Sequence, residues 1–293
     1  MPRRIRPPVD ADVHAVLDVV HARDVADLGA PDFTLEDLRA EWTAPGVELE
    51  HDARVAVAGE AVTGYAILLG DDAVVLVHPD AEGAGTGTVL RRWAEARAAE
   101  RGTGVLRQMA FGANDGARAH LREAGYEPKQ HYFRLRADLA AVPPPPSLAL
   151  RTFEPGDEAA VHRLVQDAFA EIEGNVEQTL EQWRAKGIGR ESHDPSLWLL
   201  VDDDEGPVGA ALGERWEEGT GYVAELAVSA RARGRGYGRG LLLGLFDAFR
   251  RAGLVRAELS VHGRNRSALA LYESAGMRTV WEAERWEKAL GSA

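Results

Sequence analysis

Residues 228–242 read Val-Ser-Ala-Arg-Ala-Arg-Gly-Arg-Gly-Tyr-Gly-Arg-Gly-Leu-Leu. An apolar run at 222–228 leads into this stretch, glycine occupies every second position from Gly234 to Gly240, and an apolar-periodic segment follows. This pattern predicts a strand, a glycine loop and a helix, in that order. Glycines let several backbone N–H groups turn toward one point, and a helix N-terminus adds partial positive charge. The stretch therefore predicts a binding site for an anion such as a phosphate group.

Two common phosphate motifs do not fit these residues. A P-loop requires a Gly-Lys-Ser/Thr triplet, and no lysine follows any of the glycines. A dinucleotide fingerprint requires a third glycine three residues after the second, but Arg239 follows the pair Gly234/Gly236 at that distance, and Leu241 follows Gly236/Gly238. The phosphate site is therefore of another type.

The pattern Arg233-x-x-Gly236-x-Gly238 resembles motif A of the GNAT superfamily of acyl-CoA-dependent N-acyltransferases, whose loop binds the pyrophosphate of coenzyme A. Further along, 259–261, Asn265 and the run Leu-Tyr-Glu-Ser-Ala-Gly-Met at 271–277 resemble motif B of the same superfamily. The resemblance implies an α/β (α+β) fold, in which a mixed, mostly antiparallel, twisted sheet is flanked by helices.

An internal duplication is visible in the sequence. Residues 77–90 can be laid over 228–241 at a distance of 151 positions, and the same distance relates Asn114 to Asn265 and Gly125 to Gly276. A constant offset over such a length indicates two copies of one domain. We therefore predict two tandem GNAT folds, at 1–140 and 148–293. The Pro-rich linker at 141–147 should be stiff, because four consecutive prolines favour polyproline II.

Periodicity and turn signals predict the elements of both copies. In the first copy, strands are expected at 4–6, 54–57, 62–69, 73–77, 105–110 and 132–135, and helices at 13–25, 34–42, after the glycine loop and at 115–124. In the second copy, strands are expected at 148–152, 197–201, 208–215, 222–228, 255–261 and 279–288. Its helices are expected at 157–170, 177–185, after the glycine loop and at 265–275. The helix after the second glycine loop should bury one apolar stripe, made of Leu241, Leu242, Leu245, Phe246 and Phe249.

Composition limits the functional classes. The chain has 293 residues, 45% hydrophobic and 28% charged, which suits a globular protein of two domains. The formal charge of -13 argues against a nucleic-acid partner. No cysteine is present, which excludes disulfides, thiolate metal sites and an acyl-cysteine route. No apolar run approaches the ~18 residues of a membrane span, so we expect a cytoplasmic protein without a membrane partner.

The two copies differ at positions that carry chemistry. Glu82 occupies the first copy where the second has Arg233, and a carboxylate beside a pyrophosphate is repulsive. Leu121 stands where the second copy has Tyr272. The N-terminal copy is therefore expected to be catalytically degenerate and to serve as a scaffold, although its glycines could still hold a CoA-like ligand weakly.

The resemblance implies acetyl transfer from acetyl-CoA, as cosubstrate, to a primary amine by direct attack. Tyr272 matches the general acid of the family, and Glu225 is the candidate general base. No metal is implied, because the spacing of His162, Asp167, His193 and Asp194 fits no zinc or EF-hand pattern. The residues predicted to bind the cosubstrate are Leu226, Ala227, Val228, Arg233, Gly234, Arg235, Gly236, Tyr237, Gly238, Arg239 and Asn265.

Alternative interpretations stay open for several of these residues. Tyr272 would also serve as a packing aromatic, Asn265 as the N-cap of the following helix, and Glu225 as a surface carboxylate. An ordered-water path would do the work of a base. Several relatives carry a catalytic carboxylate near the position of Tyr222, and this chain does not.

The acceptor is predicted to be a small-molecule amine, bound by 169–183 and 280–286, and the acidic run at 169–174 would suit a cationic one. The tandem architecture resembles that of mycothiol synthases, members of the same superfamily, and only the architecture is carried over. Antibiotic amines and protein amines remain open as acceptors, as does a non-catalytic acyl-CoA-binding or interaction protein. A monomer or a homodimer is expected.

Overall fold

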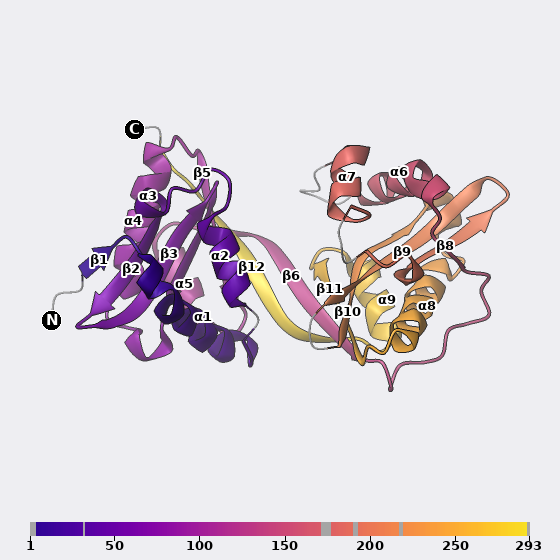
Figure 1. Cartoon of the computed structure of the whole chain (residues 1–293), viewed down its shortest axis with the longest axis horizontal. Helices are drawn as coiled ribbons and strands as arrows, with labels where there is room; N and C mark the ends of the chain where they lie inside the picture. Colours follow the sequence, from indigo (N-terminus) through magenta and orange to yellow (C-terminus); the bar gives the residue numbers. More distant parts are fainter. Residues whose placement is uncertain (1–3, 32, 171–176, 190–192, 217–218, 292–293) are drawn as a thin grey trace. The chain divides into compact units, whose positions relative to one another are not determined.

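The computed structural model describes residues 4–31, 33–170, 177–189, 193–216 and 219–291 (Figure 1). The chain forms two compact units. The first comprises Met1–Tyr132 together with Trp281–Ala293, and the second comprises Phe133–Val280. Among the described helices, none combines the length and the apolar character that a bilayer span requires.

The first unit is a sheet with helices on both sides, and its strands follow the order β1-β2-β3-β4-β5-β12. Neighbouring strands are antiparallel except β4 and β5, which are parallel at Asp72↔Arg107. Its strands are β1 (Arg4–Arg6), β2 (Ala53–Ala58), β3 (Ala61–Leu69), β4 (Asp72–Val77) and β5 (Val105–Phe111). Its helices are α1 (Val13–Leu28), α2 (Leu35–Trp42), α3 (Leu49–Asp52), α4 (Thr86–Glu100) and α5 (Asp115–Glu123).

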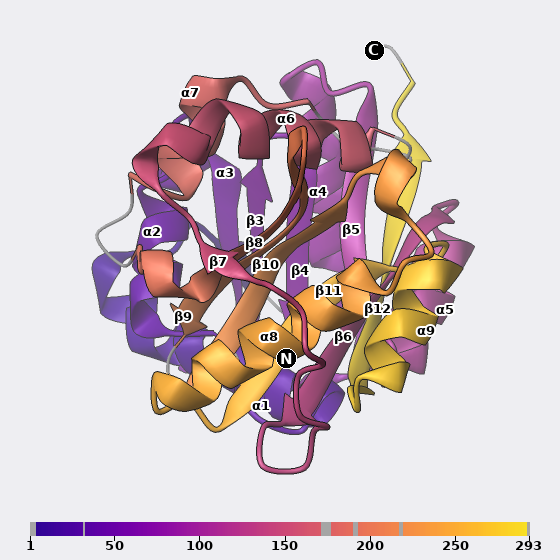
Figure 2. The same cartoon turned by 90° about the vertical axis from the view of Figure 1, so that its right-hand side faces the viewer.

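The second unit repeats this plan, with strand order β6-β11-β10-β9-β8-β7. Helices α6 and α7 lie on one side of the strands, and α8 and α9 lie on the other (Figure 2). Its strands are β6 (Glu127–Asp138), β7 (Arg151–Thr152), β8 (Trp198–Asp203), β9 (Gly206–Trp216), β10 (Thr220–Val228) and β11 (Arg256–His262). Its helices are α6 (Glu158–Phe169), α7 (Leu180–Lys186), α8 (Tyr237–Arg251) and α9 (Arg266–Ser274).

The closing strands of the two copies are exchanged. Strand β12 (Arg278–Ala289) was expected to close the second copy, but it pairs with β5 of the first unit, from Ala283↔Phe111 to Ala289↔Val105. Strand β6 belongs to the first copy by sequence, and its residues from Phe133 onward belong to the second unit. Alternating patterns reveal that a strand forms but not which edge it joins. The division at the linker 141–147, which contains no helix or strand, stays a prediction.

The duplication is confirmed element by element in the second halves of the copies. The pairs α4/α8, β5/β11, α5/α9 and β6/β12 each start 151 positions apart. The first halves are 145 positions apart, as the matching pairs Arg6/Arg151, Asp12/Asp157 and Thr34/Thr179 show. Six additional residues therefore lie between α7 and β10 of the second copy. At the shorter offset, residue 23 corresponds to residue 168.

The core of the second unit forms around α8, as its apolar stripe predicts. Leu241, Leu242, Leu245, Phe246 and Phe249 are all fully buried. Glycines in the facing strands allow this close approach, because a Cβ atom on Gly221 would lie 2.5 Å from the ring of Phe249. The helix N-terminus is thereby fixed against the sheet, directly after the glycine loop.

Candidate functional site

The central feature of the second unit is a cleft where strands β10 and β11 are no longer paired. Strands β10 and β11 pair in parallel at Thr220↔Arg256, Gly221↔Ala257 and Tyr222↔Glu258, and both strands continue well past this register. A cleft of about 740 Å³ lies in the region where they continue. Its lining residues are Ala168, Phe169, Leu226, Val228, Ala232, Arg233, Gly234, Gly236, Tyr237, Gly238, Arg239, His262, Arg264, Asn265, Ser267, Ala268, Leu271 and Tyr272.

The predicted order of strand, glycine loop and helix is confirmed at one end of this cleft. Gly234 and Gly236 have φ angles of 77° and 81°, in the left-handed region where side chains are strained. Gly236 is the N-cap of α8. The first turn of a 15-residue helix therefore faces the cleft with its unpaired N–H groups, which is the arrangement that binds phosphate.

The arginines of the loop have different surroundings. Arg233 and Arg239 line the cleft, and the Nη2 atom of Arg239 donates to the Ser274 carbonyl at 3.4 Å. Arg231 forms an ion pair with Asp203 instead. Of the residues predicted to bind the cosubstrate, all line the cleft except Ala227, which is buried, and Arg235.

A β-bulge decides where Glu225 points. Val223 pairs with Gly213 and Glu225 pairs with Leu212, so Ala224 is the extra residue. Tyr222 pairs with Glu214, which is two residues from Leu212 in β9 and therefore on the same face. Without the bulge, positions 222 and 225 would face opposite sides. The bulge instead brings Glu225 to the face where Tyr222 lies.

Glu225 is held by the helices that cover this face. The indole Nε1 of Trp183 in α7 donates to Glu225 Oε2 at 3.2 Å. Burial raises the pKa of Glu225 above its ordinary value, and the Trp183 hydrogen bond offsets part of that rise. Glu225 is therefore half-buried rather than fully exposed. Glu225 does not itself line the cleft, but it precedes the lining residue Leu226, and a half-buried carboxylate with a raised pKa beside a cleft is a candidate for proton transfer.

Tyr272 lies in α9 with its side chain in the cleft and 9% of its surface exposed. Burial, with a contribution from Tyr222, raises its pKa to about 12. The phenol is thus fully protonated at neutral pH and can act as a hydrogen-bond donor.

Asn265 caps α9, and the capping interpretation is confirmed. Its Oδ1 atom accepts from the Ala268 N–H at 3.1 Å, as Asn114 Oδ1 accepts from the Ala117 N–H at 2.8 Å in the other unit. Asn265 also lines the cleft, so the cap places its side chain beside any bound ligand.

The first unit has a corresponding cleft of about 500 Å³, with a different arrangement of charge. Arg23 of α1 enters it, 9% exposed, and forms ion pairs with Asp27, at 2.7 Å, and with Glu82 of the glycine loop. In the second unit the equivalent positions are Ala168 and Arg233. The arginine is therefore on the helix in the first unit and on the glycine loop in the second. In the first unit Glu82 of the loop neutralises its charge.

Several residues of the second site were not foreseen individually. Trp183 fell within the segment 169–183 that was expected to bind the acceptor, but nothing in the sequence paired it with Glu225. His262 and Arg264, which line the cleft, gave no signal. The acidic residues Glu171 and Glu173 lie outside the described residues.

Three of the four residues that were considered for metal binding have other partners. His162 Nε2 lies 2.7 Å from the Gln178 carbonyl, the His193 ring packs against Trp198, and Asp194 accepts from Ser196 and Arg215. In the described part of the chain, no three metal-ligating side chains come together.

Comparisons with known proteins agree with this geometry. Residues 159–277 match the model of the acetyltransferase (GNAT) family. The chain is 37% identical over 266 residues to a mycothiol acetyltransferase of Beutenbergia cavernae, covering 84% of this chain and 86% of the relative. It is 30% identical over 298 residues to a mycothiol acetyltransferase of Geodermatophilus obscurus, covering 95% of each chain.

Solved structures show the same architecture. A GCN5-related N-acetyltransferase from Sphaerobacter thermophilus superimposes with a TM-score of 0.82 at 29% identity, covering 98% of this chain and 96% of that one. A tandem GNAT protein from the clavulanic acid biosynthesis pathway superimposes over the whole of both chains, with a TM-score of 0.73 at 17% identity. The second likeness shows the fold alone.

Proposed function

Because the chain belongs to the GNAT family of acetyltransferases and is an N-acetyltransferase, we propose that it acetylates the primary amine of a small molecule, with acetyl-CoA as donor. The observation that carries this proposal is the cleft of the second unit. One end holds the glycine loop and Arg233, and its walls include Tyr272, with Glu225 on the adjoining face of β10. The anion site and Glu225 therefore belong to one continuous strand, loop and helix, and Tyr272 reaches the cleft from α9.

The cleft fits the phosphates of the cosubstrate. The first turn of α8 offers N–H groups, Gly234 and Gly236 leave the approach to them free of side chains, and Arg233 adds a positive charge. Leu226 and Val228 supply an apolar wall that leads from the loop toward the middle of β10. We assign the phosphate end of acetyl-CoA to the loop and its acyl end to the neighbourhood of Leu226.

Glu225 is proposed as the general base. Its carboxylate would accept a proton from the acceptor ammonium, so that the nitrogen lone pair can attack the thioester carbon. The raised pKa serves this role, since a base whose pKa lies nearer the working pH accepts a proton more favourably. A hydrogen bond from the buried Trp183 keeps the carboxylate in place.

Tyr272 is proposed as the donor to the departing thiolate. The ordinary pKa of a thiol is about 8.5, so full transfer from a phenol with a pKa of about 12 is uphill by roughly 5 kcal/mol. Hydrogen-bond donation to the negative charge that develops on sulfur avoids this cost. Tyr272 thus acts as an electrostatic stabiliser of the departing thiolate, and the sulfur takes its proton from solvent after the C–S bond breaks.

The N-terminal unit is proposed as a catalytically silent scaffold. Glu82 and Arg23 neutralise each other beside its glycine loop, so a pyrophosphate would have to break that pair and desolvate a carboxylate. Leu121, which replaces the tyrosine, lines the cleft and is buried. The division of labour between 1–140 and 148–293 follows from these differences.

The test is a direct assay of the purified protein. Acetyl-CoA is supplied with a panel of primary amines, CoA release is followed with a thiol reagent, and the acetylated product is identified by mass spectrometry. The panel includes deacetylated mycothiol, because two relatives carry the name mycothiol acetyltransferase, and lysine peptides for the protein-amine alternative.

A substitution links the assay to the site. Glu225→Gln should lower kcat by roughly 10²- to 10⁴-fold without changing the affinity for acetyl-CoA. Glu205→Gln, at an exposed turn before β9, is the matched control and should behave like the unchanged protein. Tight acetyl-CoA binding without turnover on any amine would instead support the non-catalytic acyl-CoA-binding protein.

A further inference from the structure

Two aromatic rings form a stacked pair on the face of the sheet where Glu225 lies. The Trp216 ring of β9 lies parallel to the Tyr222 ring of β10, with centroids 3.9 Å apart and planes inclined by 8°. We call Trp216 and Tyr222 the aromatic platform. Trp216 is 38% exposed and is the one aromatic ring among the exposed large hydrophobic side chains of the described residues. Such a ring at a strand end can still contact a ligand.

The guanidinium of an arginine lies close to both rings of the platform. The guanidinium carbon of Arg134, in β6, is 4.9 Å from the Trp216 centroid and 5.3 Å from the Tyr222 centroid. Arg134 Nη1 lies 3.6 Å from Glu258, whose Oε1 atom also accepts from Arg136 Nε at 2.6 Å. The orientation of both rings is therefore set before any ligand binds, which lowers the entropic cost of binding.

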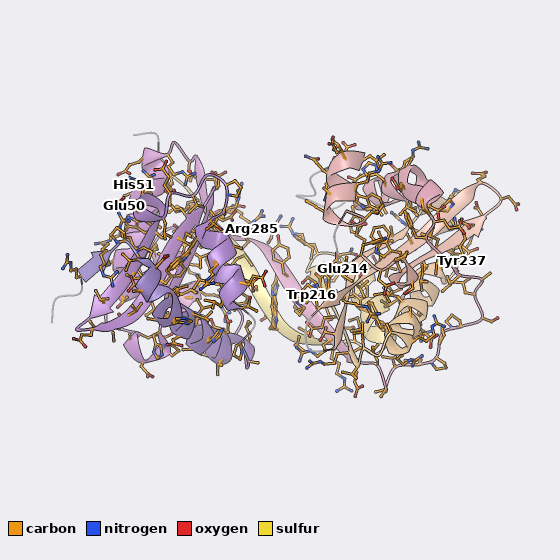
Figure 3. All side chains as sticks on the ribbon, in the orientation of Figure 1. Glu50, His51, Glu214, Trp216, Tyr237 and Arg285 are labelled. Carbon is orange, nitrogen blue, oxygen red and sulfur yellow. The ribbon has the colours of Figure 1, made fainter. Side chains whose placement is uncertain are left out.

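The aromatic platform lies on the same face of the sheet as Glu225, the proposed general base. Strand register places Tyr222 between Glu214 on one side and Glu258 on the other, and the bulge adds Glu225 to the same face. The charge of Glu214 reaches Glu225 and helps to raise its pKa, and Tyr222 acts similarly on Tyr272. Figure 3 shows Glu214 and Trp216 close together at one end of the strands, whereas Tyr237 of the phosphate-binding turn lies at the other end.

The order of these residues along the sheet indicates where each part of acetyl-CoA and of the acceptor would bind. The phosphate loop follows Val228, Glu225 and Tyr222 lie further back along β10, and Trp216 lies at the far end of the hairpin. An acceptor whose amine reaches Glu225 must therefore extend its remaining atoms toward Trp216. Glu214, beside that path, favours a positively charged group.

We propose that the aromatic platform binds the body of the acceptor, and that this body is a ring bonded directly or through one carbon to the primary amine. The ring lies with its nonpolar face on Trp216, while Glu214 attracts the ammonium and Glu225 takes its proton. Aromatic faces bind flat rings, C–H faces and cations. The inference rests on the proposed function, and it adds the shape of the substrate.

The experiment compares three primary amines in the acetyl-transfer assay, namely glucosamine for a sugar ring, benzylamine for an aromatic ring and 2-aminoethanol for a linear chain. Trp216→Ala should lower kcat/KM roughly tenfold for at least one ring amine and leave 2-aminoethanol within about twofold. Trp216→Phe should restore most of the loss. The ring amine with the larger loss of kcat/KM shows whether the acceptor carries a sugar ring or an aromatic ring. Equal losses for ring and linear amines would overturn the proposal.

A control separates this role from a structural one. Val255→Ala removes another exposed side chain near the same hairpin and should change none of the three rates. Thermal unfolding of each variant reports whether the cross-strand aromatic pair serves stability alone. A lower midpoint with unchanged selectivity among the amines would contradict ring binding.

A binding measurement distinguishes failure of the inference from failure of the proposed function. Saturation-transfer NMR detects contact between each amine and the protein, with CoA present, without any turnover. Ring amines should give signals that Trp216→Ala abolishes. If that result is obtained while no amine is acetylated, the platform stands and the proposed reaction is wrong. If Trp216→Ala leaves the signals unchanged, the platform does not bind the acceptor.

Discussion

The Trp183 indole donates to the Glu225 carboxylate at 3.2 Å, from helix α7 to the bulged strand β10. Trp183 is 3% exposed and packs against the rings of His162, at 5.8 Å, and Trp198, at 5.5 Å. The donor therefore has little freedom, and the carboxylate is oriented by a group that lies 42 positions earlier in the chain. This relationship makes the role of Glu225 testable through Trp183.

Trp183→Phe should move the acidic limb of the pH profile to higher pH. The hydrogen bond from Trp183 is the largest influence that lowers the pKa of Glu225 against the effect of burial, so its removal raises this pKa further. Glu225 must be ionised to accept a proton, so activity is lost as pH falls through that pKa. We expect kcat/KM at high pH to be largely kept. An unmoved limb would mean that another group titrates there.

Tyr272→Phe should lower kcat by roughly 100-fold, because a donor aimed at developing charge is lost and the ring is kept. The dissociation constant of acetyl-CoA, measured by calorimetry, should not change. Tyr65→Phe offers a matched control, since Tyr65 is buried in the first unit and does not line this cleft. Unaltered turnover in Tyr272→Phe would leave packing as the function of this ring.

Calorimetric titration with acetyl-CoA should give one site per chain, and Arg233→Glu should abolish it. The substitution copies the loop of the first unit without supplying the neutralising arginine, since residue 168 is alanine in the second unit. Two sites in the unchanged protein, or one that survives Arg233→Glu, would assign a cosubstrate site to the N-terminal cleft.

Glu82→Gln should create a second, weaker site in the same titration. The change removes the carboxylate that repels a pyrophosphate and leaves the buried Arg23 paired with Asp27 alone. Thr88→Gln, in the first turn of α4 and also lining that cleft, serves as the control. A stoichiometry that stays at one after Glu82→Gln would mean that the ion pair is not what keeps the cosubstrate out.

Gly221→Ala should destabilise the second unit by about 1 to 3 kcal/mol, the usual cost of overpacking a filled core. The added Cβ would lie 2.5 Å from the buried Phe249 ring, so strand or helix must shift. Chemical denaturation measures the free energy of unfolding. Gly156→Ala is the control, because a Cβ there meets nothing within 4 Å. Equal stability of the two variants would show that α8 moves freely against the sheet.

Much of the fold could be predicted because it depends on neighbours in the chain. The left-handed glycines of the loop, the apolar stripe of α8 and the cap at Asn265 are decided within a few residues of one another. The difference between the two copies could also be predicted, because aligning the sequence with itself places Glu82 opposite Arg233.

The site required contacts that no local pattern encodes. One extra residue at Ala224 reverses the face of Glu225, and a bulge of this kind depends on the partner strand rather than on the strand that contains it. Arg23 and Glu82 are 59 positions apart, and nothing near either residue names the other as its partner.

The sequence by itself determined the loop, the helices and most of the strands, the duplication, and the type of residue available for each chemical role. The tertiary structure alone decided that β12 joins β5, that the bulge brings Glu225 to the face of Tyr222, that Trp183 donates to Glu225 and that Trp216 stacks on Tyr222. The reason is physical. Backbone propensity and periodicity act over a few residues, whereas the partner of a strand edge or a buried side chain is chosen by packing between distant segments.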